Sequence, residues 1–279
     1  MLDKDLRQLL SVIEKSSGFD ASQYRFSTLM RRLNLRLSAT HSSNYRDYIK
    51  FIRKDPSECQ RFIQTLTINV TDFFRDKDVF LFLKKNYFPQ LKARADKRKN
   101  RSLSLWSMGC SRGQEPYTLA ILWHEFLKNK INDYQIKILA TDIDPEALAR
   151  AKSGLYTPKE TANIPKSYLR KYFSQQDGML QIKPALQKMI KFKQLDIIKQ
   201  PPPGKFDMIF CRNVFIFFES SLQKKIIKKL YISLKKDGLL ILGKSEMLHD
   251  EELFLCLSHH YHVYKKVNNN IPSSNSNKY

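Results

Sequence analysis

Hydrophobic residues in the first 76 positions recur every three to four residues and do not alternate with polar ones as they do along a strand. This spacing predicts amphipathic helices. One helix ends near Gly18, and its apolar stripe is formed by Leu6, Leu9, Leu10 and Ile13. Two more helices are predicted over residues 45–52 and 56–66. We therefore expect an all-α N-terminal domain over residues 1–76.

Residues 22–37 predict a further helix that combines an apolar face with a basic border. The apolar face consists of Phe26, Leu29, Met30, Leu33 and Leu37. The arginines that stack along the edge of this face are Arg25, Arg32 and Arg36. Such a stripe suits the docking of an acidic partner, although in most proteins it is a solvated helix face.

The pattern changes beyond the helical domain. Residues 77–101 start as an amphipathic helix and end in the run KARADKRKNR, which predicts a basic helical connector. Over residues 102–267 short apolar runs alternate with helices, which predicts an α/β fold with a mostly parallel sheet covered on both faces. Prolines interrupt this rhythm over residues 155–188, so we expect an inserted subdomain there. The polar residues 268–279 are predicted to be disordered. Strands are predicted at 103–108, 136–141, 189–195, 206–211 and 239–243, with at least one more in 253–267.

Basic residues outnumber acidic ones by 49 to 27, which gives the 279-residue chain a formal net charge of +22. Such a charge favours a nucleic acid, an anionic membrane or an acidic protein surface as partner. No apolar run is long enough to span a bilayer and no signal-peptide core is present, so we expect a cytoplasmic protein without membrane insertion. The four cysteines are far apart, which predicts reduced thiols and no metal site.

The turn from Gly109 to Pro116, GCSRGQEP, follows the first predicted strand of the sheet. In a doubly wound sheet, ligands bind at this carboxyl edge, where the backbone can approach them closely. Glu115 would repel a pyrophosphate but suits a cationic ligand such as S-adenosylmethionine. Asp142, at the end of the second strand, is placed to accept hydrogen bonds from ribose hydroxyls. Together these residues favour a cofactor that carries adenosine.

Two other observations concern the same edge of the sheet. The spacing Gly109-x-Ser111-x-Gly113 also matches the nucleophile elbow of hydrolases, but no oxyanion segment or complete triad accompanies it, and we disfavour that function. The fourth predicted strand ends in Arg212 and Asn213, which places polar groups at the ligand-binding edge.

Five segments together resemble the chemotaxis receptor glutamate methyltransferases of the CheR type, in order and in approximate spacing. They are INVTDFFRD, WSMGCSRGQEPYTLA, ILATDIDPEALARAKSGLY, FDMIFCRNVFIFF and DGLLILGKSE. The similarity covers about residues 5–265. It implies a Rossmann-like class I methyltransferase domain that uses S-adenosylmethionine and leaves S-adenosylhomocysteine. It also implies a small antiparallel β-subdomain inserted in that domain at about 158–190, and a helical N-terminal domain.

The resemblance assigns residues on the N-terminal side of the cofactor and at its methionine and ribose ends. Asn69, Thr71 and Arg75 match the family positions that close over the cofactor. Glu115 matches the carboxylate that meets the methionine ammonium group, and Asp142 matches the one that holds the ribose.

The resemblance also assigns two residue pairs that follow strands. Asp196 and Ile197 match the pair beside the adenine, a role that their local sequence does not indicate. Arg212 and Asn213 match the Arg-Asn pair at the end of the fourth strand.

Two residues depart from the family pattern. Gln114 stands where the family usually has glutamate, and Phe217 stands where it has a tyrosine near the methyl-transfer centre. Phe217 keeps the ring but lacks the hydroxyl, which is expected to slow turnover unless Tyr117 or a water takes its place. A SAM-binding regulatory module with weakened catalysis is therefore an alternative function.

The basic charge raises a nucleic-acid methyltransferase as another alternative. The fourth strand ends in Cys-Arg-Asn-Val, which lacks the Asn/Asp-Pro-Pro-aromatic motif of DNA amino-methyltransferases. The three prolines at 201–203 are not followed by the cysteine that cytosine-C5 enzymes need. Because basicity alone marks only an electrostatic partner, we expect no nucleic-acid substrate.

The resemblance implies that the substrates are methyl-accepting chemotaxis receptors, whose acidic cytoplasmic helical bundle would dock on the stripe formed by Arg25, Arg32 and Arg36. A glutamate side chain, with a pKa near ~4.3, is ionised at neutral pH and needs no general base. Arg75 is our candidate catalytic residue, because a guanidinium can hold a carboxylate in a fixed fork. We expect the protein to be a monomer.

Overall fold

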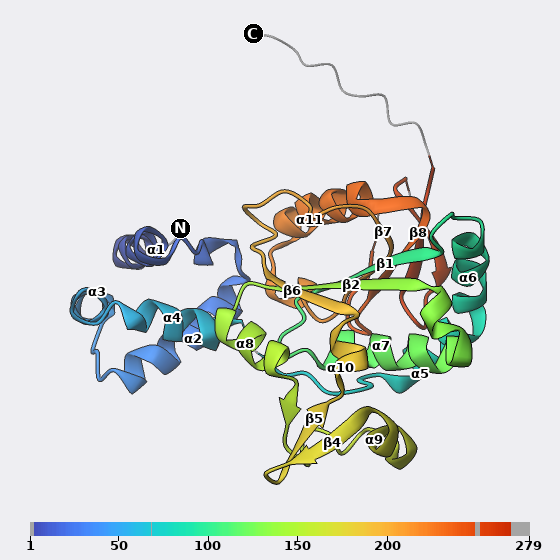
Figure 1. Cartoon of the computed structure of the whole chain (residues 1–279). Coiled ribbons are helices and arrows are strands. Elements are labelled where there is room, and N and C mark those ends of the chain that lie inside the picture. The colour runs from blue at the N-terminus through green and yellow to red at the C-terminus, as the bar shows by residue number, and fades with distance from the viewer. Residues whose placement is uncertain (1–2, 68, 249–251, 269–279) are drawn as a thin grey trace.

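The chain forms a small helical lobe and a larger α/β lobe (Figure 1). The computed structural model describes residues 3–67, 69–248 and 252–268. The tail predicted to be disordered lies outside these residues, except for Asn268. The small lobe contains α1 (Lys4–Ser17), the 3-10 helix η1 (Ala21–Gln23), α2 (Phe26–Ala39), α3 (Tyr45–Lys54) and α4 (Ser57–Leu66).

The prediction that a helix begins at Ser22 is wrong for the first turn. A short 3-10 helix ends at Gln23, and α2 begins only at Phe26. Tyr24 between them is extended, with φ −90° and ψ 151°, because its main chain forms an antiparallel bridge with Phe218 of the larger lobe. Phe26, predicted on the apolar face, is 54% exposed as a result. A contact between the lobes therefore overrides the local helical pattern.

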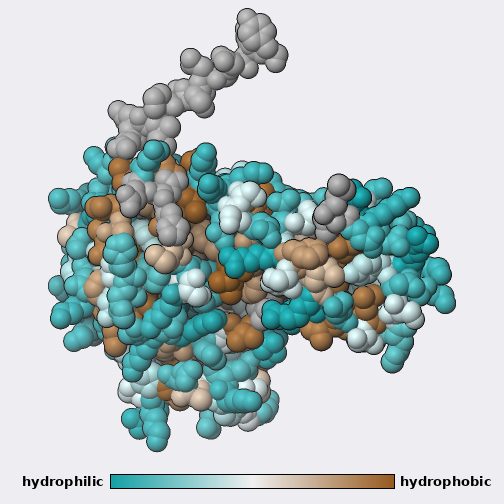
Figure 2. Space-filling view, turned by 180° about the vertical axis from the view of Figure 1, so that it is seen from behind, coloured by the Kyte–Doolittle hydropathy of each residue, from teal (hydrophilic) through white to brown (hydrophobic). Residues whose placement is uncertain are grey.

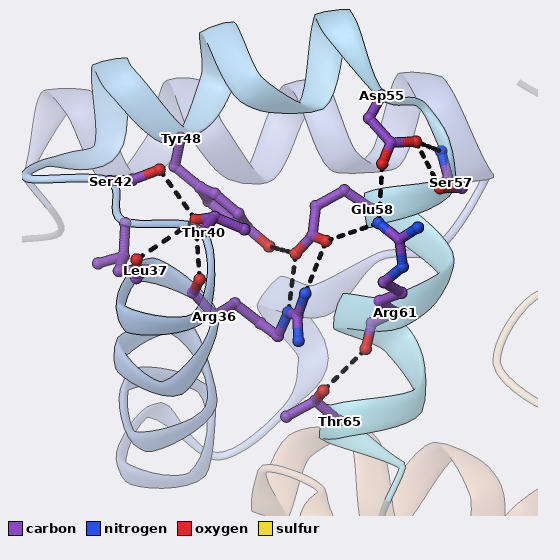
Figure 3. A network of polar contacts seen from close by, with 10 residues as sticks. All are labelled: Arg36, Leu37, Thr40, Ser42, Tyr48, Asp55, Ser57, Glu58, Arg61 and Thr65. Atoms are coloured by element: carbon purple, nitrogen blue, oxygen red, sulfur yellow. Dashed lines mark hydrogen bonds and ion pairs between the residues drawn. The ribbon is translucent and has the colours of Figure 1, made fainter.

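A buried carboxylate joins three helices of the small lobe (Figure 3). Glu58 in α4 is fully buried and accepts hydrogen bonds from Arg36 Nε and Nη2 in α2 and from the Tyr48 hydroxyl in α3, each at 2.7 Å. Burial raises the pKa of Glu58, but the bonds from Arg36 and Tyr48 outweigh burial and lower the pKa overall. Arg36 is thus committed to an internal ion pair.

The larger lobe is built on a seven-stranded sheet in the order β6-β2-β1-β7-β8-β10-β9. The first five strands in this order are parallel, and β10 and β9 complete the sheet as antiparallel strands. This arrangement confirms the predicted α/β fold. The strands are β1 (Ser102–Met108), β2 (Gln135–Asp142), β6 (Ile190–Gln194), β7 (Phe206–Cys211), β8 (Leu234–Leu242), β9 (Phe254–Ser258) and β10 (Val263–Lys266).

Helices cover both faces of this sheet (Figure 1). Helix α11 lies on one face, and α5 and α7 lie on the other. Residues 77–101 fold largely as α5 and α6, and the Phe88 ring of α6 stacks on Trp123 of α7 with centroids 4.1 Å apart. The helical elements are α5 (Lys77–Asn86), α6 (Phe88–Asp96), α7 (Gln114–Leu127), η2 (Lys128–Asp133), α8 (Pro145–Ser153), α9 (Lys166–Tyr172), α10 (Pro184–Gln187), η3 (Phe215–Phe217) and α11 (Ser220–Ser233).

The predicted inserted subdomain is present as a three-stranded antiparallel sheet in the order β3-β5-β4. It projects from the lower edge of the larger lobe in Figure 1. Its strands are β3 (Leu155–Tyr156), β4 (Phe173–Gln176) and β5 (Met179–Ile182).

The small lobe and the α11 side of the sheet share one hydrophobic core. Leu9 and Ile13 of α1 belong to the same buried cluster as Trp106 of β1 and Ile226 of α11. A second cluster fills the other face of the sheet, between the strands and α5, α6 and α7. The two lobes are therefore packed against each other, which fixes their relative position.

Candidate cofactor-binding site

A cavity opens where the small lobe meets the carboxyl edge of the sheet. Figure 2 shows hydrophobic side chains gathered around the recess between the two lobes. Together with the open space at its mouth, the cavity encloses about 1020 Å³. All nine residues predicted to contact the cofactor line it: Asn69, Thr71, Arg75, Glu115, Asp142, Asp196, Ile197, Arg212 and Asn213.

The floor of the cavity is the tight turn between β1 and α7. Gly109 has φ +68°, and a Cβ atom there would lie 2.6 Å from Val214 Cγ2, so this position requires glycine. The Gly109 and Cys110 amides both donate to the Thr141 carbonyl, which ties the turn to the end of β2. Backbone at this edge is thus exposed to a ligand in the cavity.

Asp142, at the end of β2, is held by main-chain donors. Its Oδ2 accepts from the Ser111 amide at 2.7 Å and its Oδ1 from the Asp144 amide at 3.0 Å. The residue is 8% exposed, and burial raises the pKa of its carboxyl, an effect that these backbone bonds oppose. Each oxygen retains a lone pair that can accept from a ligand hydroxyl.

Glu115 and Arg212, which also line the cavity, form a partly buried ion pair. Arg212 Nη1 lies 3.3 Å from Glu115 Oε2, and the Ser107 hydroxyl donates to Glu115 Oε1 at 2.7 Å. Arg212 Nη2 also bonds the Arg75 carbonyl and the Asp76 carboxylate. Burial raises the pKa of Glu115, while Arg212 pulls it down. A second cation beside this carboxylate would stabilise its ionised form further.

The residues carried on the segment before α5 close one side of the cavity. Asn69 Nδ2 donates to Asp144 Oδ2 at 2.6 Å, and Arg75 Nη1 donates to the Val70 carbonyl at 3.0 Å. The segment is anchored from behind, because the Phe74 amide donates to Thr118 Oγ1 of α7. Asn69, Thr71 and Arg75 therefore reach the cavity from the chain that joins the two lobes.

The loop after β6 forms the far end of the cavity. Asp196 Oδ1 accepts from the Ile198 amide at 2.8 Å. Lys229 of α11 donates to the carbonyls of Ile197, Ile198 and Gln200, which fixes the loop. This end combines one carboxylate with apolar side chains, a surface suited to a flat heterocycle.

The sequence comparisons identify the family to which this structure belongs. The model described as "CheR methyltransferase, SAM binding domain" matches residues 69–263, and the model described as "CheR methyltransferase, all-alpha domain" matches residues 4–67. The chain belongs to the CheR methyltransferase family. It is therefore a methyltransferase of chemotaxis, and its cofactor is S-adenosylmethionine.

Curated relatives agree with the family models over most of the chain. A chemotaxis protein methyltransferase of Borreliella burgdorferi is 34% identical over 88% of this chain and 88% of the relative. The one from Escherichia coli K12 is 31% identical over 88% of this chain and 84% of the relative. Among solved structures, a glycopeptide N-methyltransferase complexed with S-adenosylmethionine aligns at 11% identity, over 55% of this chain and 52% of that one, with a TM-score of 0.33.

The cavity has features that fit this cofactor. The partly buried Glu115 carboxylate suits the ammonium group, and Asp142 keeps acceptors for ribose hydroxyls. The buried hydroxyl of Ser111 has no hydrogen-bond partner in the described part of the chain. Three cavity residues thus offer polar atoms that a bound cofactor can engage.

Two residues of this site were not predicted. Tyr24 of the small lobe is 5% exposed and lines the cavity, and its pKa is raised by burial and by the carboxylates of Asp196 and Asp142. Glu246 lies outside the cavity lining and accepts main-chain bonds from Asn213, Phe215 and Gly243. No local pattern marks Tyr24, whereas Glu246 ends the GKSE motif that the resemblance already contained.

Phe217, which departs from the family pattern, lies at the cofactor cavity. Phe217 lines the cavity, but Tyr117 does not, and the Tyr117 hydroxyl donates to the Ala151 carbonyl from a fully buried position. Of the two substitutes considered for the missing hydroxyl, Tyr117 is excluded, because its ring is buried in the second core cluster and does not line the cavity. Tyr24 is the tyrosine that lines the cavity.

The predicted docking stripe is only partly available. Arg25 is exposed, with Nε donating to the Phe218 carbonyl at 3.3 Å, and Arg32 is half-buried. Arg36 is bound to Glu58 through both Nε and Nη2, so it is not free to meet a partner, and we remove it from the docking surface. Within the described residues, no group of three His, Cys, Asp or Glu side chains is arranged to hold a metal ion. None of the helices described is long and apolar enough to cross a membrane.

Proposed function

We propose that this protein transfers the methyl group of S-adenosylmethionine to glutamate side chains on the cytoplasmic helices of chemoreceptors, in the cytoplasm. The cofactor supplies a methyl group activated by a positively charged sulfur. A substrate carboxylate is already a nucleophile at neutral pH, so the protein has to align and partly desolvate it. The observation that carries the proposal is a cavity that holds every predicted cofactor residue beside an arginine, Arg75.

Arg75 is the residue that we propose positions the substrate carboxylate. It lines the cavity, and its positive charge lowers the pKa of nearby Glu115. Nη1 is bound to the Val70 carbonyl, which orients the guanidinium while its other donors remain available. We assign the remaining eight lining residues listed above to cofactor binding.

The docking surface that we propose for the acidic receptor bundle comprises Arg25 and Arg32, extended by the exposed Arg31. The Nε atom of Arg32 is buried and has no hydrogen-bond partner in the residues that the structure describes. Burial and the neighbouring Arg31 lower the pKa of Arg32. A cation in this setting gains most from an approaching carboxylate, which is what an acidic helix provides.

The test is an incubation of the protein with labelled S-adenosylmethionine and cytoplasmic receptor fragments from the same organism. We expect base-labile methyl ester on fragments with glutamate at the modified positions and none on fragments with glutamine there. Arg75→Ala should abolish ester formation, whereas Arg53→Ala, an exposed arginine of α3, should leave it unchanged.

Three outcomes would contradict the proposal. Cofactor binding without any transfer would favour a regulatory module in which Phe217 marks lost catalysis. Methyl transfer to nucleic acid, with none to receptor fragments, would favour a nucleic-acid methyltransferase. Normal ester formation by Arg75→Ala would remove Arg75 from the catalytic role.

A further inference from the structure

One half of the α11 side of the sheet carries no helix. Residues 195–205 connect β6 to β7 without a named helix: they form one hydrogen-bonded turn, closed by the bond from the Gln200 amide to the Asp196 carbonyl, and then the proline run 201–203. The strand register places Ser104, Lys137 and Lys191 toward this uncovered half, since Ser104 pairs with Lys137 and Leu139 with Lys191. A groove lies here, away from the cofactor cavity.

Lysines surround this groove. Five of them line it: Lys137, Lys188, Lys191, Lys193 and Lys205. Lys205 donates to the Ile232 carbonyl. Among the described residues, no aspartate or glutamate lines the groove and none of these lysines forms an ion pair. Because each uncompensated ammonium repels the others, an anionic partner would relieve the repulsion.

The floor and rim of the groove resemble a peptide-binding surface. Leu139 and Met189 are half-buried and provide an apolar floor. Strand β6 is the edge of the sheet, so its outer main-chain groups have no strand partner within the described chain. Lys191 and Lys193 are two residues apart on the same side of β6, a spacing of about 6.6 Å along a strand.

We infer that this lysine groove binds an acidic segment of a partner protein in extended conformation. Main-chain bonds to the edge of β6 would supply affinity, and carboxylates at every second position would face Lys191 and Lys193. A single-stranded nucleic acid is disfavoured, because Phe206 is the groove's one aromatic residue and is 6% exposed, which leaves no stacking platform. The inference does not depend on the proposed methyl acceptor.

Edge lysines also occur in proteins simply to prevent strands of different molecules from pairing. Edge protection and recognition of an acidic segment predict different effects of charge reversal on peptide binding. If the lysines only protect the edge, charge reversal leaves peptide binding unaffected and changes self-association. If they recognise an acidic segment, charge reversal removes binding.

The experiment uses the full chain and a fluorescent octapeptide that alternates glutamate and threonine, with a glutamine–threonine peptide as control. The variant is Lys137→Glu with Lys191→Glu. Its matched control is Lys224→Glu with Lys228→Glu on the exposed side of α11, which changes the net charge equally. Unchanged binding of S-adenosylhomocysteine shows that both variants are folded.

We expect the groove variant to bind the acidic peptide at least about tenfold more weakly than wild type, and the α11 variant to change affinity by less than about twofold. Hydrogen exchange of the amides of residues 190–194 should slow when the peptide is added. Equal losses in the two variants, no binding by the wild type, or tighter binding of an oligonucleotide of equal charge would each overturn the inference.

Discussion

Glu246 is a positioning residue whose removal should disturb the loop after β7, residues 212–217, without emptying the cofactor site. Its Oε2 accepts from the amides of Asn213 and Gly243 at 2.8 and 2.7 Å, and its Oε1 accepts from the amide of Phe215 at 2.7 Å. The residue is 4% exposed. Asn213 has φ +60°, a left-handed conformation that asparagine adopts more readily than most residues. The carboxylate of Glu246 holds the main chain on either side of this turn.

Glu246→Gln keeps the size of the side chain but replaces one acceptor oxygen with a donor. The amide oxygen can retain the two bonds made by Oε2, whereas the NH₂ group faces the Phe215 amide. One unpaired buried amide costs about 1–3 kcal/mol. For a chain of this size that lowers Tm by roughly 2–5 °C. Glu246→Ala leaves all three amides without this partner and should be more severe.

Turnover should fall more than cofactor affinity. A shift of the loop by about 1 Å is enough to reduce kcat by about 100-fold, because alignment dominates this reaction. Among the described residues assigned to cofactor binding, Glu246 accepts a hydrogen bond from Asn213 alone, and from its main chain, whereas Glu115, Asp142 and Asn69 are held by other partners. The Kd for S-adenosylhomocysteine should therefore change by less than about threefold, that is by less than ~0.7 kcal/mol.

The assay combines thermal unfolding, calorimetric binding of S-adenosylhomocysteine and initial rates of methyl transfer. Glu252→Gln, at an exposed carboxylate nearby, is the matched control and should behave as wild type. Wild-type Tm and kcat in Glu246→Gln would show that the three amide bonds do not shape the loop, and the reasoning would be refuted.

Further predictions concern the cavity and the small lobe. Tyr24→Phe should weaken S-adenosylhomocysteine binding by about 2–10-fold, the equivalent of one hydrogen bond, with kcat unchanged, while Tyr45→Phe outside the cavity has no effect. Phe217→Tyr should raise kcat with an unchanged Kd; a lower kcat would argue against the family pattern here. Because burial raises the pKa of Glu115, cofactor affinity should fall as pH drops through that raised pKa, and titrations of Glu115→Gln should lack this decline. The pKa of Glu58 is lower in the folded state than in the unfolded state. The ionised Glu58 therefore stabilises the fold above its unfolded pKa, and this stabilisation is lost as pH falls through its folded pKa. Glu58→Gln should lower the free energy of unfolding at neutral pH by about 3 kcal/mol and make that free energy less dependent on pH in the acid range.

Much of the larger lobe was predictable from local pattern. Strand ends could be located because a buried strand followed by a polar residue marks the carboxyl edge, which is how Glu115, Asp142 and the Arg212-Asn213 pair were found. Asp196 and Ile197 follow a strand in the same way, yet the side chain of Asp196 is indistinguishable in sequence from one that only caps its own loop. Resemblance to the family was needed to include them.

The residues that escaped prediction depend on partners far along the chain. Tyr24 is extended because its main chain pairs with Phe218, and no feature of residues 20–26 predicts that pairing. Arg36 was expected to meet a receptor, but Glu58 on another helix binds it. In both cases the helical period was correct nearby, and a tertiary contact decided what the side chain does.

The shared core has a consequence for how the protein melts. Because α1 and α11 pack into the same buried cluster, neither lobe can lose its structure without exposing the apolar face of the other. The Arg25 amide also donates to the Phe217 carbonyl at 2.8 Å, so the seam between the lobes is joined by main chain as well as by side chains. The two family domains should therefore unfold in a single calorimetric transition. The cavity is lined by Tyr24 from the small lobe and by Glu115 from the larger one, so a cofactor bound there should raise the temperature of that transition as a whole.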